Sequence, residues 1–329
     1  MHRADGDLGG MADEDPRPPF RGDPVAGYRL WFNRDELRSR GPEVPPRVEQ
    51  TPEGMRYIAP SDSDAGGTWI AVNELGITVC LLNGYRAPQS PETESTKSES
   101  TRSDSTESEP LDTAAKDSAA KDSAAEDSAA EDSALEDSAL EDSAAENSEA
   151  QGRARWTSRG HLVRELAGVR SHAEVWRQMA PGQLARYRPL VLAVLVPDRP
   201  ALIVRWDGRD AVLDPRGELQ LPVLSSSHEQ SEVDRRRRQR FHDMVRTDLS
   251  SGQPIHAAEL EAFQSWAPEA GADAYSPSMS RPDAGTRSQC MVVVSPEEVR
   301  LRYTAGPPHS TQPGPSVRLP RRMKPRSRR

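Results

Sequence analysis

The sequence predicts a layered α+β fold, and three features of its 329 residues support this prediction. The expected strand at 77–82 is apolar on both faces, with Ile77, Val79 and Leu81 on one face and Cys80 and Leu82 on the other. Both of its faces are therefore covered, as in a sheet between two other layers. Three short apolar runs at 190–196, 201–206 and 211–213 are separated by turn residues, a pattern typical of antiparallel strands. Helical patterns precede and follow these runs, so helices and sheets both contribute to the expected core.

Composition places the core in only part of the chain. Hydrophobic residues make up 34% of the sequence and aromatic residues 5%, which is too little for a chain of this length that folds throughout. Residues 89–150 contain 19 acidic and 4 basic residues, whereas residues 307–329 contain seven arginines or lysines and no acidic residue. The rest of the chain is close to neutral. This argues against a nucleic-acid-binding core, because such a core presents a basic face.

The sequence therefore predicts one folded domain with charged segments outside it. The acidic segment contains a five-residue repeat whose alanine pairs spread around a helix axis, and it lacks the large apolar residues that a core needs. The predicted organisation is a disordered leader at 1–24, a single domain formed by 25–88 and 153–306, a disordered acidic repeat insertion at 89–152, and a basic disordered tail at 307–329.

The sequence gives no sign of a metal, a cofactor, a disulfide framework or a membrane span. Cys80 and Cys290 lie in apolar runs, and the seven histidines show no ligand spacing. The longest apolar run, 190–196, is far shorter than the roughly 20 residues that a membrane helix requires, and the N-terminus has no hydrophobic signal segment. A cytoplasmic protein is expected.

The N-terminal half is expected to contain a strand at 28–32 and a strand pair at 68–72 and 77–82. In the turn that joins the pair, Gly76 supplies the positive φ of a tight reversal. The first strand is followed by four polar residues, 33–36, which form either a solvated turn or part of a site. Asn83 directly follows the strand pair and is either a turn residue or a site amide.

The C-terminal half is expected to contain helices at 164–179 and 231–245, another helix around 260–266, and a last strand pair at 291–294 and 299–303. Ser171 is the expected N-cap within the first of these segments. The arginine run at 235–238 is interpreted as a solvated helix face, with phosphate binding as the alternative.

Several motifs occur in an order that resembles one known family. They are FNRDE at 32–36, GGTWIAVNELGITVCLLNGYR at 66–86, and then TSRGHLVRELAG, ARYRPLVLAVL, LSSSHEQSEVDRRRRQRF and RPDAGTRSQCMVVVSPEEVRLRYTAG. Together they resemble the NRDE family, also called the transport and Golgi organisation 2 family. The resemblance covers about 25–88 and 153–306.

This resemblance implies a fold and a site like those of the N-terminal nucleophile hydrolases. The fold would be an αββα sandwich of two stacked, mainly antiparallel sheets flanked by helices. Asn83, at the end of a strand that follows an Asn-Glu-x-Gly turn, would be an oxyanion-hole donor. Arg34 and Asp35 would hold and polarise the nucleophile and its amine, and Asn33 is a further site candidate. Arg34, Asp35 and Asn83 are therefore expected to converge on one pocket.

The sequence departs from the family pattern in two places. Family members begin with methionine and then cysteine, whereas this sequence begins Met1-His2, so the expected nucleophile is missing as the sequence is written. Cys80 is a poor replacement, because a thiol within an apolar strand has a raised pKa and low reactivity. Ser280 stands where the family has a histidine before Arg281.

Three functional hypotheses follow. The first is a non-catalytic binding or trafficking protein, for which the resemblance implies haem or lipid handling and a small acyl or lipid-like ligand. The second is an amide hydrolase that uses an N-terminal cysteine supplied by a different start. The third is an interaction protein in which the charged segments bind partners, including weak polyanion binding by the basic tail.

Overall fold

The computed structural model describes residues 27–85, 156–179, 181–246 and 255–322. The predicted leader at 1–24 and the predicted insertion at 89–152 lie outside these residues. The elements are β1 (Tyr28–Leu37), β2 (Glu43–Gln50), β3 (Arg56–Asp62), β4 (Ile70–Asn73), β5 (Thr78–Asn83), α2 (Arg159–Leu166), α3 (His172–Gln178), α4 (Pro181–Leu184), β6 (Leu190–Leu195), β7 (Leu202–Trp206), β8 (Ala211–Asp214), a 3-10 turn (Gly217–Gln220), α5 (Gln230–Met244), α6 (Ala257–Gln264), β9 (Ala284–Val294), β10 (Glu298–Thr304) and β11 (Ser316–Pro320).

The strands form two antiparallel sheets. The smaller sheet has the order β1-β9-β10-β11, and the larger one runs β2-β3-β4-β5-β6-β7-β8 in simple sequence order. Every pairing within the two sheets is antiparallel. The acidic segment enters the chain between β5 and β6, two neighbouring strands of the larger sheet.

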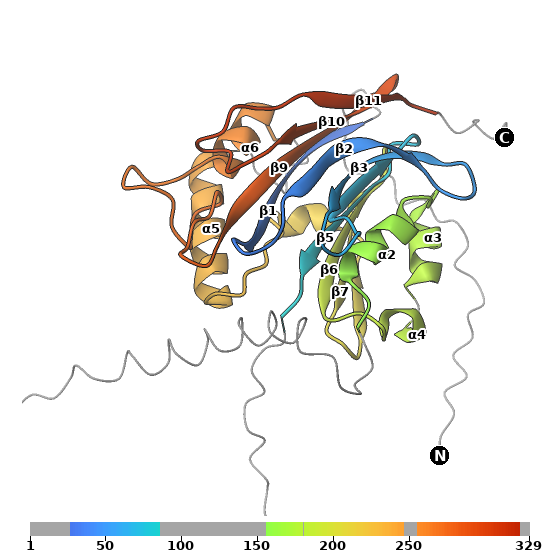
Figure 1. Ribbon diagram of the computed structural model, residues 1–329, viewed down its shortest axis with the longest axis horizontal. Coiled ribbons are helices and arrows are strands. Elements are labelled where there is room, and N and C mark those ends of the chain that lie inside the picture. The colour runs from blue at the N-terminus through green and yellow to red at the C-terminus, as the bar shows by residue number, and fades with distance from the viewer. Residues whose placement is uncertain (1–26, 86–155, 180, 247–254, 323–329) are drawn as a thin grey trace, which may run out of the picture. The chain divides into compact units, whose positions relative to one another are not determined.

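The two sheets face each other and helices cover their outer faces (Figure 1). Between the sheets, side chains such as Ile70 and Cys80 from the larger sheet meet Cys290 and Leu301 from the smaller one. Helices α2, α3 and α4 cover the other face of the larger sheet, where Leu166 is fully buried. Helices α5 and α6 lie on the outer side of the smaller sheet and join each other through a separate apolar cluster. The predicted αββα sandwich is therefore confirmed.

The expected turn between the central strands is present and has a clear physical basis. Gly76 has a φ of +83°, and the side chain of Asn73 organises the turn by accepting hydrogen bonds from the backbone N–H groups of Leu75 and Ile77. The amide nitrogen of Asn73 donates to the carbonyls of Ala167 and Val169 at 3.0 and 2.9 Å. One buried asparagine thus joins the central turn to the end of α2.

The helix and meander predictions also agree with the structure. Ser171 caps α3 and accepts a hydrogen bond from the backbone N–H of Glu174. Strands β6, β7 and β8 form the expected antiparallel meander. Among the described helices, none has both the length and the apolar composition that a membrane crossing requires.

The first strand is longer than predicted, and β2 and β3 have no counterpart in the predicted elements. Residues 33–36 continue β1 to Leu37, so the interpretation as a solvated turn is wrong. Strand β2 contains Pro45 and Pro46, whose missing N–H groups argue against a central strand. The structure tolerates both prolines because β2 is an edge strand whose pairing with β3 shifts register between Val44 and Arg47.

The start of the predicted basic tail is also corrected. Residues 316–320 form β11, which pairs with β10 and buries Leu319 against the inter-sheet core. Arg322 continues from this strand to the larger sheet, where its backbone N–H donates to the carbonyl of Glu74 and its guanidinium lies 3.2 Å from the Glu74 carboxylate. Strand β11 has only two apolar residues besides proline, Val317 and Leu319, and they lie between Pro315 and Pro320. The sequence signal for a strand is therefore weak. The tail residues 323–329 lie outside the described part.

Candidate functional site

Strand β1 presents its polar residues alternately to the two faces of the smaller sheet. Tyr28, Leu30 and Phe32 pack against the inter-sheet core, so Arg34 follows them toward the larger sheet. Asn33 and Asp35 point to the opposite face, where their partners come from α6, α5 and the neighbouring loops. The pairing of β1 with β9 shifts register between Arg34 and Asp35. The NRDE motif is therefore divided between two environments.

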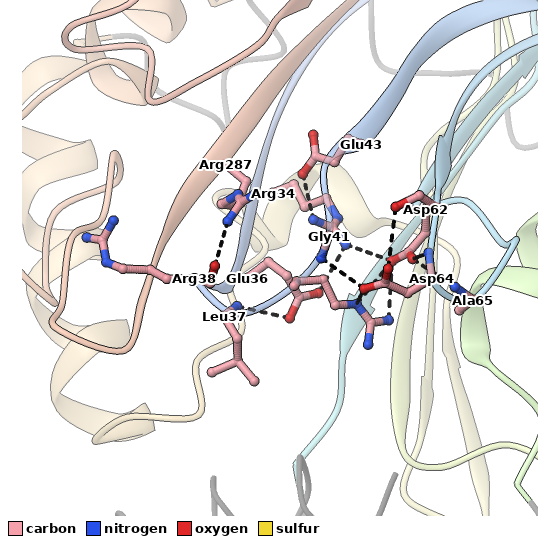
Figure 2. A network of polar contacts seen from close by, with 12 residues as sticks. Arg34, Glu36, Leu37, Arg38, Gly41, Glu43, Asp62, Asp64, Ala65 and Arg287 are labelled. Carbon is pink, nitrogen blue, oxygen red and sulfur yellow. Dashed lines mark hydrogen bonds and ion pairs between the residues drawn. The ribbon is translucent and has the colours of Figure 1, made fainter. Parts of the chain in front are cut away.

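Arg34 is the centre of a buried ionic network (Figure 2). Its guanidinium donates to Glu43 at 2.6 Å, to Asp62 at 2.9 Å and to Glu36 at 3.1 Å. It also lies over the ring of Trp69, with 4.4 Å between the guanidinium carbon and the ring centroid. Three carboxylates and one aromatic face thus surround this guanidinium.

Further groups hold the carboxylates of this network. The hydroxyl of Tyr303 donates to the second oxygen of Glu43, and the guanidinium of Arg40 donates to Asp62. Burial alone would raise the pKa of Asp62, but the backbone N–H of Ala65 and the charges of Arg40 and Arg34 outweigh it and hold the pKa below its usual value. The network connects β1 and β10 of the smaller sheet with β2 and β3 of the larger one.

The side chain of Asn33 connects β1 to the end of α6 and to the loop that contains Pro277. Its side-chain nitrogen donates to the carbonyls of Gln264 and Pro277 at 2.8 and 2.9 Å, and its oxygen accepts a hydrogen bond from Gln289. Both N–H groups of the Asn33 amide and one of the two lone pairs of its oxygen are used in these hydrogen bonds. These contacts indicate a structural role for Asn33.

Asp35 lies in a separate polar cluster beneath α5. The Thr286 hydroxyl donates to it at 2.6 Å, and Arg237 on α5 lies 3.6 Å from its second oxygen. Burial raises the pKa of Asp35 above its usual value, although Arg237 and Thr286 oppose this shift. The arginine-run interpretation is therefore wrong for Arg237, which is buried rather than solvated. Its spacing from Val233 and Phe241, four residues either way, is the sequence signal that places it on the buried helix face.

Asn83 is the last residue of β5, so it is a strand residue and not a turn residue. Its backbone carbonyl accepts a hydrogen bond from the hydroxyl of Ser225. Desolvation raises the pKa of the neighbouring Tyr85 above its usual value, and the charge of Arg159 opposes this shift.

The four site candidates have different surroundings. Arg34 lies on the inter-sheet side of β1, whereas Asn33 and Asp35 lie on the opposite face and are bound to other partners. The expected convergence of Arg34 and Asn83 on one pocket stays a prediction. Sequence reasoning did not identify the partners that define these environments, Glu43, Asp62 and Tyr303. No local pattern marks them, because the stacking of the sheets brings Glu43 and Asp62 to Arg34, and Tyr303 reaches Glu43 from another strand.

Both cysteines of the sequence lie in the inter-sheet core. Cys80 is 1% exposed and Cys290 is 0% exposed. Burial raises the pKa of each thiol well above its usual value. A neutral, enclosed thiol is a poor nucleophile, as predicted for Cys80. Within the described residues no group of three or more histidine, cysteine or carboxylate side chains has the arrangement of a metal site.

Comparison with known proteins agrees with the resemblance seen in the motifs. The family model of Transport and Golgi organisation 2 matches residues 22–134. The predicted family resemblance is confirmed. The matched range includes β1 with its NRDE motif and the central strand pair β4 and β5. The motifs that follow residue 152 lie outside it, so their assignment stays a prediction. A search of curated proteins gives no match.

Proposed function

We propose that the folded part of this Transport and Golgi organisation 2 family protein is a non-catalytic binding module built on a fold like that of the N-terminal nucleophile hydrolases. The observation that carries the proposal is the position of its thiols. The sequence has two cysteines, and both are enclosed between the sheets with raised pKa values. Neither can supply the thiolate that cysteine-dependent acyl transfer requires.

The surroundings of Arg34 support the same proposal. An arginine that positions a nucleophile keeps part of its guanidinium available to the reacting groups, whereas Arg34 is bound by Glu36, Glu43 and Asp62. Its role in this module is to hold the strands of the two sheets in place. The family description points to a role in transport, and a small acyl or lipid-like molecule is the proposed ligand class.

The proposal is tested first by the reactivity of the thiols. A colorimetric thiol reagent should label neither cysteine in the folded protein and both after unfolding in guanidinium. Rapid labelling of either thiol under native conditions, at the rate of a free cysteine, would overturn the observation on which the proposal rests.

A second test measures hydrolysis and binding together. The protein should bind a fluorescent long-chain fatty acid saturably and should release no product from the corresponding fatty-acyl amides. If hydrolysis does occur, the Asn83→Ala variant distinguishes an enzyme from a contaminant. Loss of an oxyanion donor lowers the rate by about 100-fold to 1,000-fold, so a matched loss in this variant would establish the amide hydrolase alternative.

A further inference from the structure

The outer face of the smaller sheet carries a row of arginines that the proposed function does not use. The register pairs Arg29 of β1 with Val293 of β9, Val293 with Arg300 of β10, and Arg300 with Arg318 of β11. On these strands the alternate residues, such as Val292 and Leu301, face the inter-sheet core. All three arginines therefore project from the same side of the sheet, the side away from the larger sheet.

The arginine row has an excess of positive charge. Arg29 and Arg318 are exposed, and Arg300 is partly exposed. Glu298 forms an ion pair with Arg318 at 3.3 Å. In the part of the chain that the structure describes, Arg29 and Arg300 have no acidic group within ion-pair distance, and the buried Nε of Arg300 makes no hydrogen bond. The next row along the strands differs, because its arginine, Arg302, is paired with Glu261 of α6.

The geometry of the row fits a flat anionic partner. Neighbouring strands are about 4.8 Å apart, so Arg300 and Arg318 are adjacent and Arg29 lies about 10 Å from Arg300. Because the three arginines lie in one row across the sheet, their guanidinium groups can contact the same flat surface at the same time. Guanidinium groups pair well with phosphate oxygens, since their planar N–H groups match the oxygen geometry. Val293, partly exposed within the row, adds an apolar contact.

We propose that the arginine row Arg29, Arg300 and Arg318 binds the phosphate groups of an anionic lipid surface. Nucleic acid fits the same face less well. Binding of single strands uses aromatic side chains on which bases stack, and the aromatic residue nearest the row on this face, Trp31, is 7% exposed. A duplex groove is entered by a helix or a β-ribbon, whereas the row lies across a sheet of four strands. This inference is independent of the proposed function, because it rests on the arginines of the outer face and not on the thiols or on Arg34.

The test measures binding of the full-length protein to vesicles of phosphatidylcholine with or without phosphatidylserine. Binding should require phosphatidylserine and should weaken as the salt concentration rises. A triple variant with Arg29→Gln, Arg300→Gln and Arg318→Gln should partition into these vesicles about 100-fold less, from the contribution of each arginine near an anionic surface. If the triple variant fails to fold, the double variant of the exposed Arg29 and Arg318 should still lose about 10-fold or more.

Two full-length variants with the same change of charge serve as controls. The first replaces Arg177, Arg209 and Arg216, which are exposed on other elements, and should keep nearly all the binding. The second replaces Lys324, Arg326 and Arg328 of the tail and should lose less than the row variant. A loss confined to the tail variant, or equal losses in the row variant and the Arg177 control, would overturn the proposal. Preferential binding of heparin or DNA through the row, without vesicle binding, would also overturn it.

Discussion

Arg34→Met tests whether the NRDE arginine supports the fold. The substitution keeps much of the side-chain volume but removes a cation that contacts both Glu43 and Asp62. Arg40 still contacts Asp62. The side chains of Glu43, Asp62 and Glu36 are 6%, 11% and 20% exposed. Water therefore cannot replace the lost partner well.

The expected loss in the free energy of unfolding is about 3 kcal/mol. Removal of one partner from a buried ion pair costs about 3–5 kcal/mol, and loss of the contact with Trp69 adds about 0.5–1 kcal/mol. The total should lie near the lower end of this range, because Arg40 still binds Asp62 and the hydroxyl of Tyr303 still binds Glu43. Lysine at position 34 should recover only part of the loss, since one ammonium group cannot reproduce the planar contacts to three carboxylates.

Urea unfolding followed by tryptophan fluorescence measures this loss. The penalty should be largest near neutral pH and should shrink as the pH falls below the unfolded aspartate pKa of about 4 and through the lowered folded-state pKa of Asp62, because protonated Asp62 no longer needs a cation. Arg47→Met is the matched control, because Arg47 forms an ion pair with Glu49 but its side chain is 64% exposed. The control should change stability by less than about 1 kcal/mol. If Arg34→Met is no more destabilising than Arg47→Met, Arg34 does not hold the sheets together and the structural role is refuted.

Three other substitutions test particular contacts. Asn73→Ala should cost about 2–4 kcal/mol in chemical denaturation, since buried donors and acceptors lose their partner; a cost below about 1 kcal/mol would contradict this role. Arg322→Ala should lower stability by about 1 kcal/mol, because the buried carboxylate of Glu74 keeps only one of its two arginine partners; unchanged thermal unfolding would show that Arg322 is not part of the fold. Because the folded-state pKa of Asp62 is lowered, its charge stabilises the protein above the unfolded pKa of about 4 and ceases to do so as the pH falls through the lower folded pKa. The stability difference between the wild-type protein and Asp62→Asn should therefore be full near pH 7 and shrink in acid, and a difference independent of pH would contradict the assignment.

The sequence by itself determined the elements whose signals are local. The apolar strand pair, the turn at Gly76, the cap at Ser171 and the meander from β6 to β8 follow from residue periodicity and backbone preferences. These features depend on residues within a few positions of one another, so one sequence is enough to predict them. The doubly apolar strand also predicted that the sheets would be stacked.

Tertiary structure alone decided the environment of each site candidate. Strand alternation separates Arg34 from Asp35, but their partners come from distant parts of the chain, such as Glu43, Arg237 and Thr286. It also decided that residues 316–320 form an edge strand, because two apolar residues become a strand only when β10 offers a pairing edge and the core accepts Leu319. The physical reason is the same in both cases. Ion pairs and strand pairings are interactions between residues far apart in sequence, and only the folded chain brings those residues together.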